Sequence, residues 1–210
     1  MRSFRHWTPR YIWDRTAWAI FQRRYPATPW ITPTAVAILS DCLRPTDVGI
    51  EFGSGRSTAW FAARMASITS FENNPTWHAK VEAMLKHKGC TNVDLRLYDD
   101  DRSCPKGEAS CYVQAIDEWQ TASLDFALVD GICRDHCALK VIDKLQPGGL
   151  LVIDNVNWYL PSNSRSPASR SRAQGPHGPV WQAVADRLRD WRFIWTSSGV
   201  TDTAIYFKPC

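Results

Sequence analysis

Residues 48–58 read Val-Gly-Ile-Glu-Phe-Gly-Ser-Gly-Arg-Ser-Thr, and the rest of the fold can be worked out from them. The first five residues are mostly apolar and precede turn-forming residues, which is typical of a buried strand. Gly53 and Gly55 allow a sharp turn and a close approach of the backbone to a ligand. A helix is expected over residues 57–65, and its first turn leaves backbone N–H groups free to donate hydrogen bonds. The stretch therefore predicts a strand, a ligand-binding turn and a helix.

Strands and helices alternate along the sequence that follows this turn. The parallel strands are expected at residues 48–52, 68–72, 93–98, 124–129 and 150–154. Such alternation implies an α/β fold with a doubly wound, mostly parallel sheet and right-handed crossovers. Two further strands, at 192–197 and 202–208, flank Ser198-Gly199 and predict an antiparallel hairpin at one edge of the sheet.

Each of the five expected parallel strands ends on a carboxylate. These residues are Glu51, Glu72, Asp99 or Asp100, Asp130 and Asp154. Ligands of doubly wound sheets bind beyond the carboxyl ends of the strands. Packing alone does not explain an acid at every one of these ends, so we expect a polar site along this edge of the sheet.

The first turn distinguishes between two kinds of ligand. A dinucleotide-binding turn has the pattern Gly-x-Gly-x-x-Gly, whereas Thr58 stands in place of the third glycine here. Glu51, two residues before Gly53, would repel a pyrophosphate and suits a cationic ligand. A nicotinamide-dependent oxidoreductase is therefore the less favoured alternative.

Five motifs in this order resemble the class I methyltransferases that use S-adenosylmethionine (SAM). The resemblance covers roughly residues 30–208, and its motifs lie at residues 51–58, 71–75, 128–131, 145–149 and 152–155. It implies a Rossmann-like, seven-stranded sheet with a reversed last strand, SAM as the cofactor, and methyl transfer to a small or medium acceptor. A hydroxyl oxygen is the expected acceptor atom, and a catalytically silent SAM-binding or scaffold protein is the alternative function.

The resemblance also assigns the parts of the cofactor to residues. The acid and glycines of the first turn hold the methionine part, the acid after the second strand holds the ribose, and an acid after the third strand meets the adenine amine. The expected cofactor-binding residues are Glu51, Gly53, Ser54, Gly55, Ser57, Thr58, Glu72, Asn73, Asp99, Asp100 and Asp130. The sequence leaves open which of Asp99 and Asp100 meets adenine.

Within this fold, Asp130 together with Asp154-Asn155 resembles the metal-dependent catechol and caffeoyl-CoA O-methyltransferases. Two carboxylates and an amide oxygen are hard ligands that suit Mg²⁺ or another divalent cation. A metal held there would lower the pKa of a bound hydroxyl and orient it. The alternative is that Asp130 orients the cofactor while Asp154-Asn155 only turns the chain.

The catalytic base is the second open question. In the catechol subgroup a lysine lies just after the first aspartate and acts as the base. Arg134 comes nearest in this chain, and an arginine stays protonated. His136 is the better candidate by its chemistry, with a helix-surface histidine as the alternative.

Both flanks of the chain are basic. Residues 1–40 carry six arginines against one aspartate, and residues 161–210 carry seven basic and three acidic groups. We divide the chain into a basic, aromatic arm at 1–30 and a methyltransferase domain at 31–210. The arm is expected to be helical over 10–24, and residues 161–179 to form a mobile loop rich in Ser, Pro and Gly.

The basic flanks bear on the partners of the protein. We expect a small-molecule or glycan-like acceptor at the flanks, where the positive charge favours an anionic one, and no nucleic-acid partner. The arm could instead contact a membrane surface. No run approaches the roughly 18 apolar residues of a membrane span. No signal peptide is recognised, and the seven scattered cysteines suggest reduced thiols. We therefore expect the cytoplasm as the location.

Overall fold

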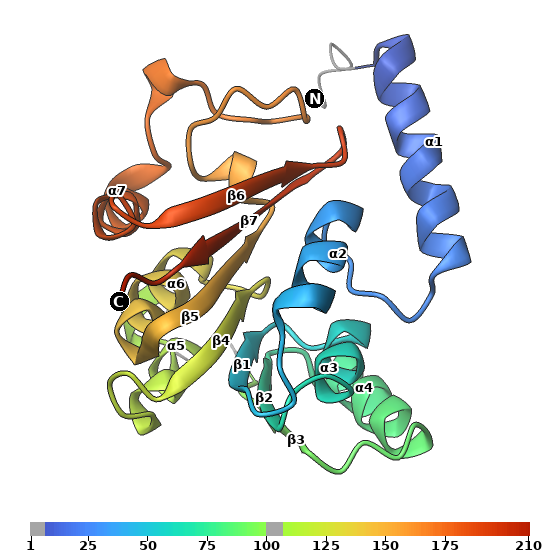
Figure 1. The fold of residues 1–210 in the computed structure, drawn as a ribbon, viewed down its shortest axis with the longest axis vertical. Helices are drawn as coiled ribbons and strands as arrows, with labels where there is room; N and C mark the ends of the chain where they lie inside the picture. Colours follow the sequence, from blue (N-terminus) through green and yellow to red (C-terminus); the bar gives the residue numbers. More distant parts are fainter. Residues whose placement is uncertain (1–6, 100–106) are drawn as a thin grey trace.

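The sheet of this protein is mixed and has seven strands. The computed structural model describes residues 7–99 and 107–210, and within them the strand order is β3-β2-β1-β4-β5-β7-β6 (Figure 1). The strands are β1 Val48–Phe52, β2 Ser67–Glu72, β3 Val93–Leu97, β4 Leu124–Val129, β5 Leu145–Asp154, β6 Arg192–Ser197 and β7 Asp202–Phe207. The first five run parallel, and β7 is antiparallel to both β5 and β6. The predicted fold is confirmed, including the C-terminal hairpin.

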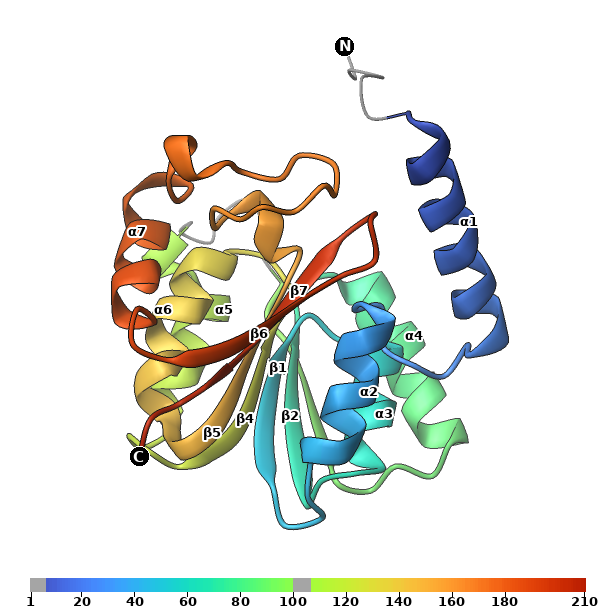
Figure 2. The ribbon, with the colours of Figure 1, turned by 45° about the horizontal axis from the view of Figure 1, so that its top comes forward.

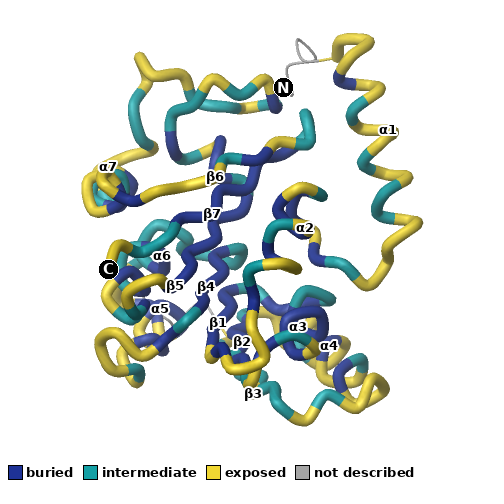
Figure 3. Tube along the Cα trace, in the orientation of Figure 1, coloured by how far each residue is buried: buried dark blue, intermediate teal, exposed yellow. Residues whose placement is uncertain are grey.

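Helices cover both faces of the sheet, which makes three layers (Figure 2). One face carries α2 Pro33–Cys42, α3 Arg56–Ala62 and α4 Pro75–His87, and the other carries α5 Cys111–Gln114, α6 Arg134–Lys144 and α7 Gly178–Arg187. Thr32 and Asn74 cap two of these helices, since each side chain accepts a hydrogen bond from a backbone N–H of the first turn. The two layers of helices bury the central strands on both faces, whereas the edge strands β3 and β6 remain partly exposed (Figure 3).

The first helix, α1 Pro9–Arg24, lies outside these layers (Figure 2). Tyr11 is its one buried residue, and the side chains of Ile12, Trp13 and Ile20 are exposed. Within the described ranges, 7–99 and 107–210, no helix is long and apolar enough to span a membrane. The division into arm and domain, the membrane-surface contact and the cytoplasmic location all stay predictions.

The turns after β1 and β4 approach each other closely. Gly53 has a φ of +97°, and a Cβ placed on it would lie 2.8 Å from the backbone nitrogen of Gly131. Its own N–H donates to the carbonyl of Phe71 at 2.9 Å, and the N–H of Asp130 donates to the carbonyl of Phe52 at 2.9 Å. Backbone contacts therefore fix the ends of β1, β2 and β4 relative to one another.

Replacement of Gly53 by alanine tests this contact. Gly53→Ala combines a left-handed backbone with a clash against the backbone of Gly131, so we expect a loss of roughly 2–5 kcal/mol in the free energy of unfolding. Gly89→Ala is the matched control, because Gly89 has a φ of +67° and nothing within 4 Å of an added Cβ. It should lose only about 1–2 kcal/mol. Equal losses in urea denaturation would show that the close approach contributes nothing.

Candidate functional site

The carboxylate of Glu51 is buried at the end of β1. Its side chain has no exposed area, and its Oε2 accepts hydrogen bonds from Thr58 Oγ1 at 2.6 Å and from Ser70 Oγ at 2.8 Å. Its Oε1 has no hydrogen-bond partner among the described residues. Burial raises the pKa of Glu51 to about 7, and the hydroxyls of Ser57, Thr58 and Ser70 lower it only in part; the Ser57 hydroxyl is near the carboxylate but does not meet hydrogen-bond geometry with Oε1. A buried oxygen without a donor is costly, so this oxygen is suited to a ligand that donates a charged N–H.

Glu72 ties the first turn to the end of β2. Its Oε2 accepts from the backbone N–H of Ser54 at 3.2 Å and from the Ser54 hydroxyl at 2.7 Å. Its Oε1 accepts from the N–H groups of Asn73 and Asn74 at 2.9 and 2.8 Å. The four acceptor positions of this carboxylate are therefore all engaged. If Glu72 holds a ribose, the Ser54 hydroxyl must turn away so that Oε2 can accept from the ligand.

A cavity of about 380 Å³ opens at this turn. Its walls are Trp30, Gly53, Ser54, Gly55, Arg56, Ser57, Trp77, Lys80, Val81, Met84 and Asp130. The indole N–H of Trp77 donates to the carbonyl of Ser54 at 2.8 Å, and the guanidinium of Arg56 lies over the ring of Trp30, 4.7 Å from its centroid. The tryptophans and the three other residues on α4 are absent from the set expected from the sequence. The position of Trp77 in the first turn of the helix after Glu72 is the signal that could have revealed it.

Other predicted residues lie apart from this cavity. Asp99 is exposed and does not line it, and Asp100 lies outside the described residues. The ring of His136 lies toward Gly107, where an added Cβ would be 3.3 Å from His136 Nε2. His136 also takes no part in the hydrogen bonds between the ends of β4 and β5. Its role as the base stays a prediction that the described contacts do not support.

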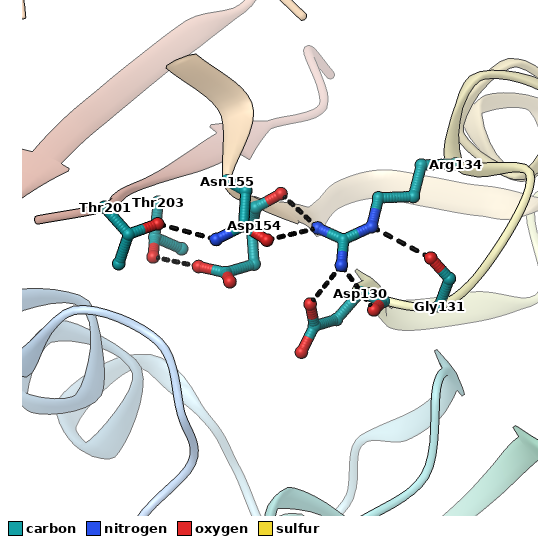
Figure 4. A network of polar contacts seen from close by, with 7 residues as sticks. All are labelled: Asp130, Gly131, Arg134, Asp154, Asn155, Thr201 and Thr203. Carbon is teal, nitrogen blue, oxygen red and sulfur yellow. Dashed lines mark hydrogen bonds and ion pairs between the residues drawn. The ribbon is translucent and has the colours of Figure 1, made fainter. Parts of the chain in front are cut away.

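The guanidinium of Arg134 joins the ends of β4 and β5 (Figure 4). Its Nη2 donates to Oδ1 and to the backbone carbonyl of Asp130 at 2.8 and 2.7 Å. Its Nη1 donates to the carbonyl of Asp154 at 2.7 Å and to Oδ1 of Asn155 at 2.9 Å, and its Nε donates to the carbonyl of Gly131 at 2.9 Å. An arginine has five N–H donors, and here all of them are used. The side chain is thus held in one place.

The residues next to Arg134 are also engaged. Asp154 accepts from Thr203 Oγ1 at 2.7 Å, and Asn155 donates through Nδ2 to Thr201 Oγ1 at 2.6 Å. Burial, followed by the charge of Asp130, raises the pKa of Asp154 well above its ordinary value. Burial also raises the pKa of Asp130, although Arg134 acts in the opposite direction.

This arrangement does not fit a divalent cation. The structure brings the three predicted ligands together, but the guanidinium of Arg134 occupies the position between Asp130 and Asn155 (Figure 4). The carboxylate of Asp154 is turned toward Thr203, and its raised pKa favours the protonated form, which is a poor metal ligand. In the described part of the chain, no group of three or more His, Cys, Asp or Glu could hold a metal ion. The positive charge expected from a metal is supplied by Arg134.

Known proteins were compared with the chain at the level of sequence and of structure. No family model matches the sequence, and no curated protein matches it. Solved structures do match. A methyltransferase of Geobacter sulfurreducens has a TM-score of 0.58 at 12% identity, covering 94% of this chain and 89% of that one. A Staphylococcus aureus protein provisionally assigned as a caffeoyl-CoA O-methyltransferase has a TM-score of 0.58 at 14% identity, with 91% of each chain covered.

A third neighbour adds a bound molecule. It is a provisionally assigned methyltransferase of Streptococcus mutans solved in complex with S-adenosylhomocysteine (SAH), with a TM-score of 0.55, 14% identity, and coverage of 84% of this chain and 98% of that one. These neighbours show that the chain has the fold of the class I SAM-dependent methyltransferases. At such identities the likeness concerns the fold, and it does not identify the acceptor.

A metal titration tests the position of Arg134. We expect Mg²⁺ and EDTA to leave the thermal unfolding midpoint of the wild-type protein unchanged, because the oxygens of Asp130 and Asn155 are engaged with the guanidinium. Arg134→Met leaves those half-buried acceptors without donors and should lower the free energy of unfolding by about 1–3 kcal/mol. Calorimetric and urea unfolding measure the two effects.

Arg23→Met is the control for the loss of one arginine, since Arg23 is exposed in the last turn of α1. It should unfold like the wild-type protein. A clear rise of the wild-type midpoint with Mg²⁺ would contradict our interpretation, because a cation that binds the folded state stabilises it.

Proposed function

We propose that this protein is a SAM-dependent methyltransferase that methylates a hydroxyl oxygen without a divalent cation. The observation that carries the proposal is the unpaired Oε1 of buried Glu51, which lies in β1 two residues before Gly53. An open, buried carboxylate oxygen favours a ligand with an ammonium group and disfavours a pyrophosphate. SAM has such an ammonium group and, when bound, supplies the methyl group.

The residues around the first turn are suited to the parts of this cofactor. Glu51 would accept from the amino group, and Gly53 and Gly55 leave room for the ligand at the backbone. Glu72 would accept from the ribose hydroxyls once the Ser54 hydroxyl has turned away. The ring of Trp77 offers an apolar wall to the cavity. The Streptococcus mutans structure with SAH supports the choice of cofactor.

We assign proton removal to Asp130. This residue lines the cavity at the first turn and is also bound by Arg134, so it lies between the cofactor residues and the end of β5. Its side chain keeps 29% of its area exposed, which leaves it accessible to an acceptor. Burial raises its pKa, and a raised pKa makes a carboxylate a stronger base near neutral pH.

Arg134 has a positioning role in this scheme. A guanidinium remains protonated, so it cannot take a proton from the acceptor. By holding Oδ1 of Asp130 at 2.8 Å, it fixes the direction in which the carboxylate meets a hydroxyl. Alignment of the reacting groups and exclusion of water supply the rest of the acceleration.

The pH dependence of SAM binding tests Glu51. Its pKa of about 7 means that the free protein carries a mostly protonated Glu51 at about pH 6, whereas a cationic ligand favours the carboxylate. SAM affinity measured by calorimetry should therefore rise between about pH 6 and 7.5, by no more than tenfold per pH unit. The window stays below the pKa of about 7.7–8 of an α-amino group, so the ligand keeps its charge.

Glu51→Gln is the matched variant, and it should bind SAM more weakly and without this rise. Glu72→Ala should weaken binding by about 1–3 kcal/mol through the loss of charge-assisted hydrogen bonds. No binding of SAM by folded wild-type protein, or tighter binding of NAD, would rule out the proposed cofactor.

The activity of Asp130 variants distinguishes an enzyme from a silent SAM-binding protein. Asp130→Asn keeps an oxygen for Arg134 but removes the base, so we expect kcat to fall by about 10²–10⁴-fold with SAM affinity nearly unchanged. The measurement is SAH release with an acceptor found by screening, in the presence of EDTA. Wild-type SAM binding without turnover on any acceptor would favour a scaffold protein, and an unchanged kcat in Asp130→Asn would remove Asp130 from the chemistry.

A further inference from the structure

A large groove lies beside the hairpin of β6 and β7. It has a volume of about 1110 Å³ and runs between α1, residues 160–176, and β6. Figure 2 shows the segment between β5 and α7 reaching toward α1, with the turn of the hairpin next to it. This volume is at the upper end of the roughly 300–1,000 Å³ of small-molecule pockets, so the groove has room for an extended ligand.

The charges along the groove are mostly positive. Its walls contain four arginines, Arg10, Arg165, Arg172 and Arg189, and one aspartate, Asp14. Oδ2 of Asp14 lies 3.7 Å from Nε of Arg10, and Arg189 forms an ion pair with Asp186, which lies outside the groove. Arg165 and Arg172 are exposed, and their side chains form no hydrogen bond or ion pair with any residue in 7–99 or 107–210. These two guanidiniums are therefore available to an anion.

Arg170 shows the contrast with its two neighbours. The sequence places it in the same basic loop, but its guanidinium donates to the carbonyls of Gly175 and Gln174 at 2.7 and 3.1 Å. It shapes the loop and does not line the groove. Among the arginines that line the groove, Arg165 and Arg172 are therefore the two without an acidic partner.

The loop that carries these arginines is fixed to the body of the protein. Ser166 is 4% exposed and donates to Oδ1 of Asp202 at 2.6 Å. Asn157 donates through Nδ2 to the carbonyl of Pro167 and to the hydroxyl of Ser169, at 3.2 and 3.0 Å. The loop that the sequence predicts to be mobile is thus hydrogen-bonded to Asp202 and Asn157. Arg165, next to the buried Ser166, is presented from an anchored position, and a preorganised site loses less entropy on binding.

The other residues that line the groove suit a ligand with many hydroxyl groups. Ser162, Asn163, Ser164, Ser197 and Ser198 line the groove, and the four serine hydroxyls also take part in hydrogen bonds within the protein. The ring of Phe193 is 55% exposed and packs on Tyr206 with centroids 5.4 Å apart. Donors and acceptors together with an accessible aromatic face are the groups that bind sugar rings.

The groove and the cavity at the first turn have no lining residue in common, but a chain of hydrogen bonds links the wall of the groove to Asn155. Thr201 donates through its backbone N–H to Ser198 Oγ at 3.2 Å, and its own Oγ1 accepts from Asn155 Nδ2 at 2.6 Å. Asn155 in turn accepts from Arg134. Two hydrogen bonds therefore lead from the wall of the groove to the residue that shares Arg134 with Asp130.

We propose that this groove binds the methyl acceptor, and that the acceptor is an oligosaccharide with acidic groups. This inference rests on the proposed methyltransferase function. Arg165 and Arg172 bind the carboxylate, sulfate or phosphate groups, while the serines and Phe193 bind the sugar rings. A hydroxyl of the bound chain is then presented toward Asp130.

Calorimetry with defined oligosaccharides tests the groove. The probes are oligogalacturonate, a heparin-derived oligosaccharide and a phosphorylated mannose oligosaccharide, which carry carboxylate, sulfate and phosphate groups, with a neutral malto-oligosaccharide of the same length. We expect at least one acidic probe to bind the wild-type protein and the neutral probe to bind at least tenfold more weakly. The probe that binds best identifies the acidic group.

Two double variants of equal charge provide the comparison. Arg165→Ala/Arg172→Ala should lower the affinity for the acidic probe at least tenfold. Arg23→Ala/Arg24→Ala, at the exposed end of α1 and outside the groove, should leave this affinity unchanged. Both should bind SAM like the wild-type protein. Binding of no acidic probe, equal weakening in both variants, or equal binding of the neutral probe would overturn the proposal.

SAM binding separates this proposal from the one on which it rests. If the wild-type protein binds an acidic probe but not SAM, the methyltransferase proposal fails and the groove is a glycan site without an acceptor role. If SAM binds and the probes do not, the enzyme proposal stands and the acidic-glycan acceptor is wrong.

Discussion

The site depends on one arginine that bridges the ends of two parallel strands. The five N–H groups of Arg134 bind oxygens of Asp130, Gly131, Asp154 and Asn155, so β4 and β5 end at a fixed separation. Without this cation, the acidic residues at the two ends would repel each other in a partly buried place. Because all the donors are engaged within the protein, the guanidinium acts as a permanent structural charge, and Asp130 takes its position from it.

Glu51 shows the opposite arrangement only one strand away. The groups that stabilise its carboxylate are the hydroxyls of Ser57, Thr58 and Ser70, which do so much less than a cation would, and Oε1 has no hydrogen-bond partner among the described residues. Asp130 and Glu51 are both carboxylates, and they differ in their surroundings. Such a difference separates the roles of carboxylates within a site: Asp130 is oriented by a fixed cation, whereas Glu51 has an oxygen left for a charged ligand.

The sequence predicted those features that depend on local pattern. Apolar runs, the glycine turn after Phe52 and the acids at the strand ends are readable because neighbouring residues determine them. The position of Arg134 was not readable, because its hydrogen bonds depend on the distance in space to Asp154, 20 residues further along the chain. The anchored loop was missed for the same reason, since its serine and proline content indicates mobility while the bond from Ser166 reaches Asp202, 36 residues away.

Charge is distributed unevenly across this edge of the sheet. The first turn presents the buried acid Glu51 and the engaged acid Glu72, whereas the groove beyond the hairpin presents the free guanidiniums of Arg165 and Arg172. Asp130 lines the cavity at the first turn and is held by Arg134. A cationic cofactor and an anionic acceptor would each be attracted to the side of opposite charge and repelled from the other. The same field that recruits the two ligands would thus also orient them relative to each other.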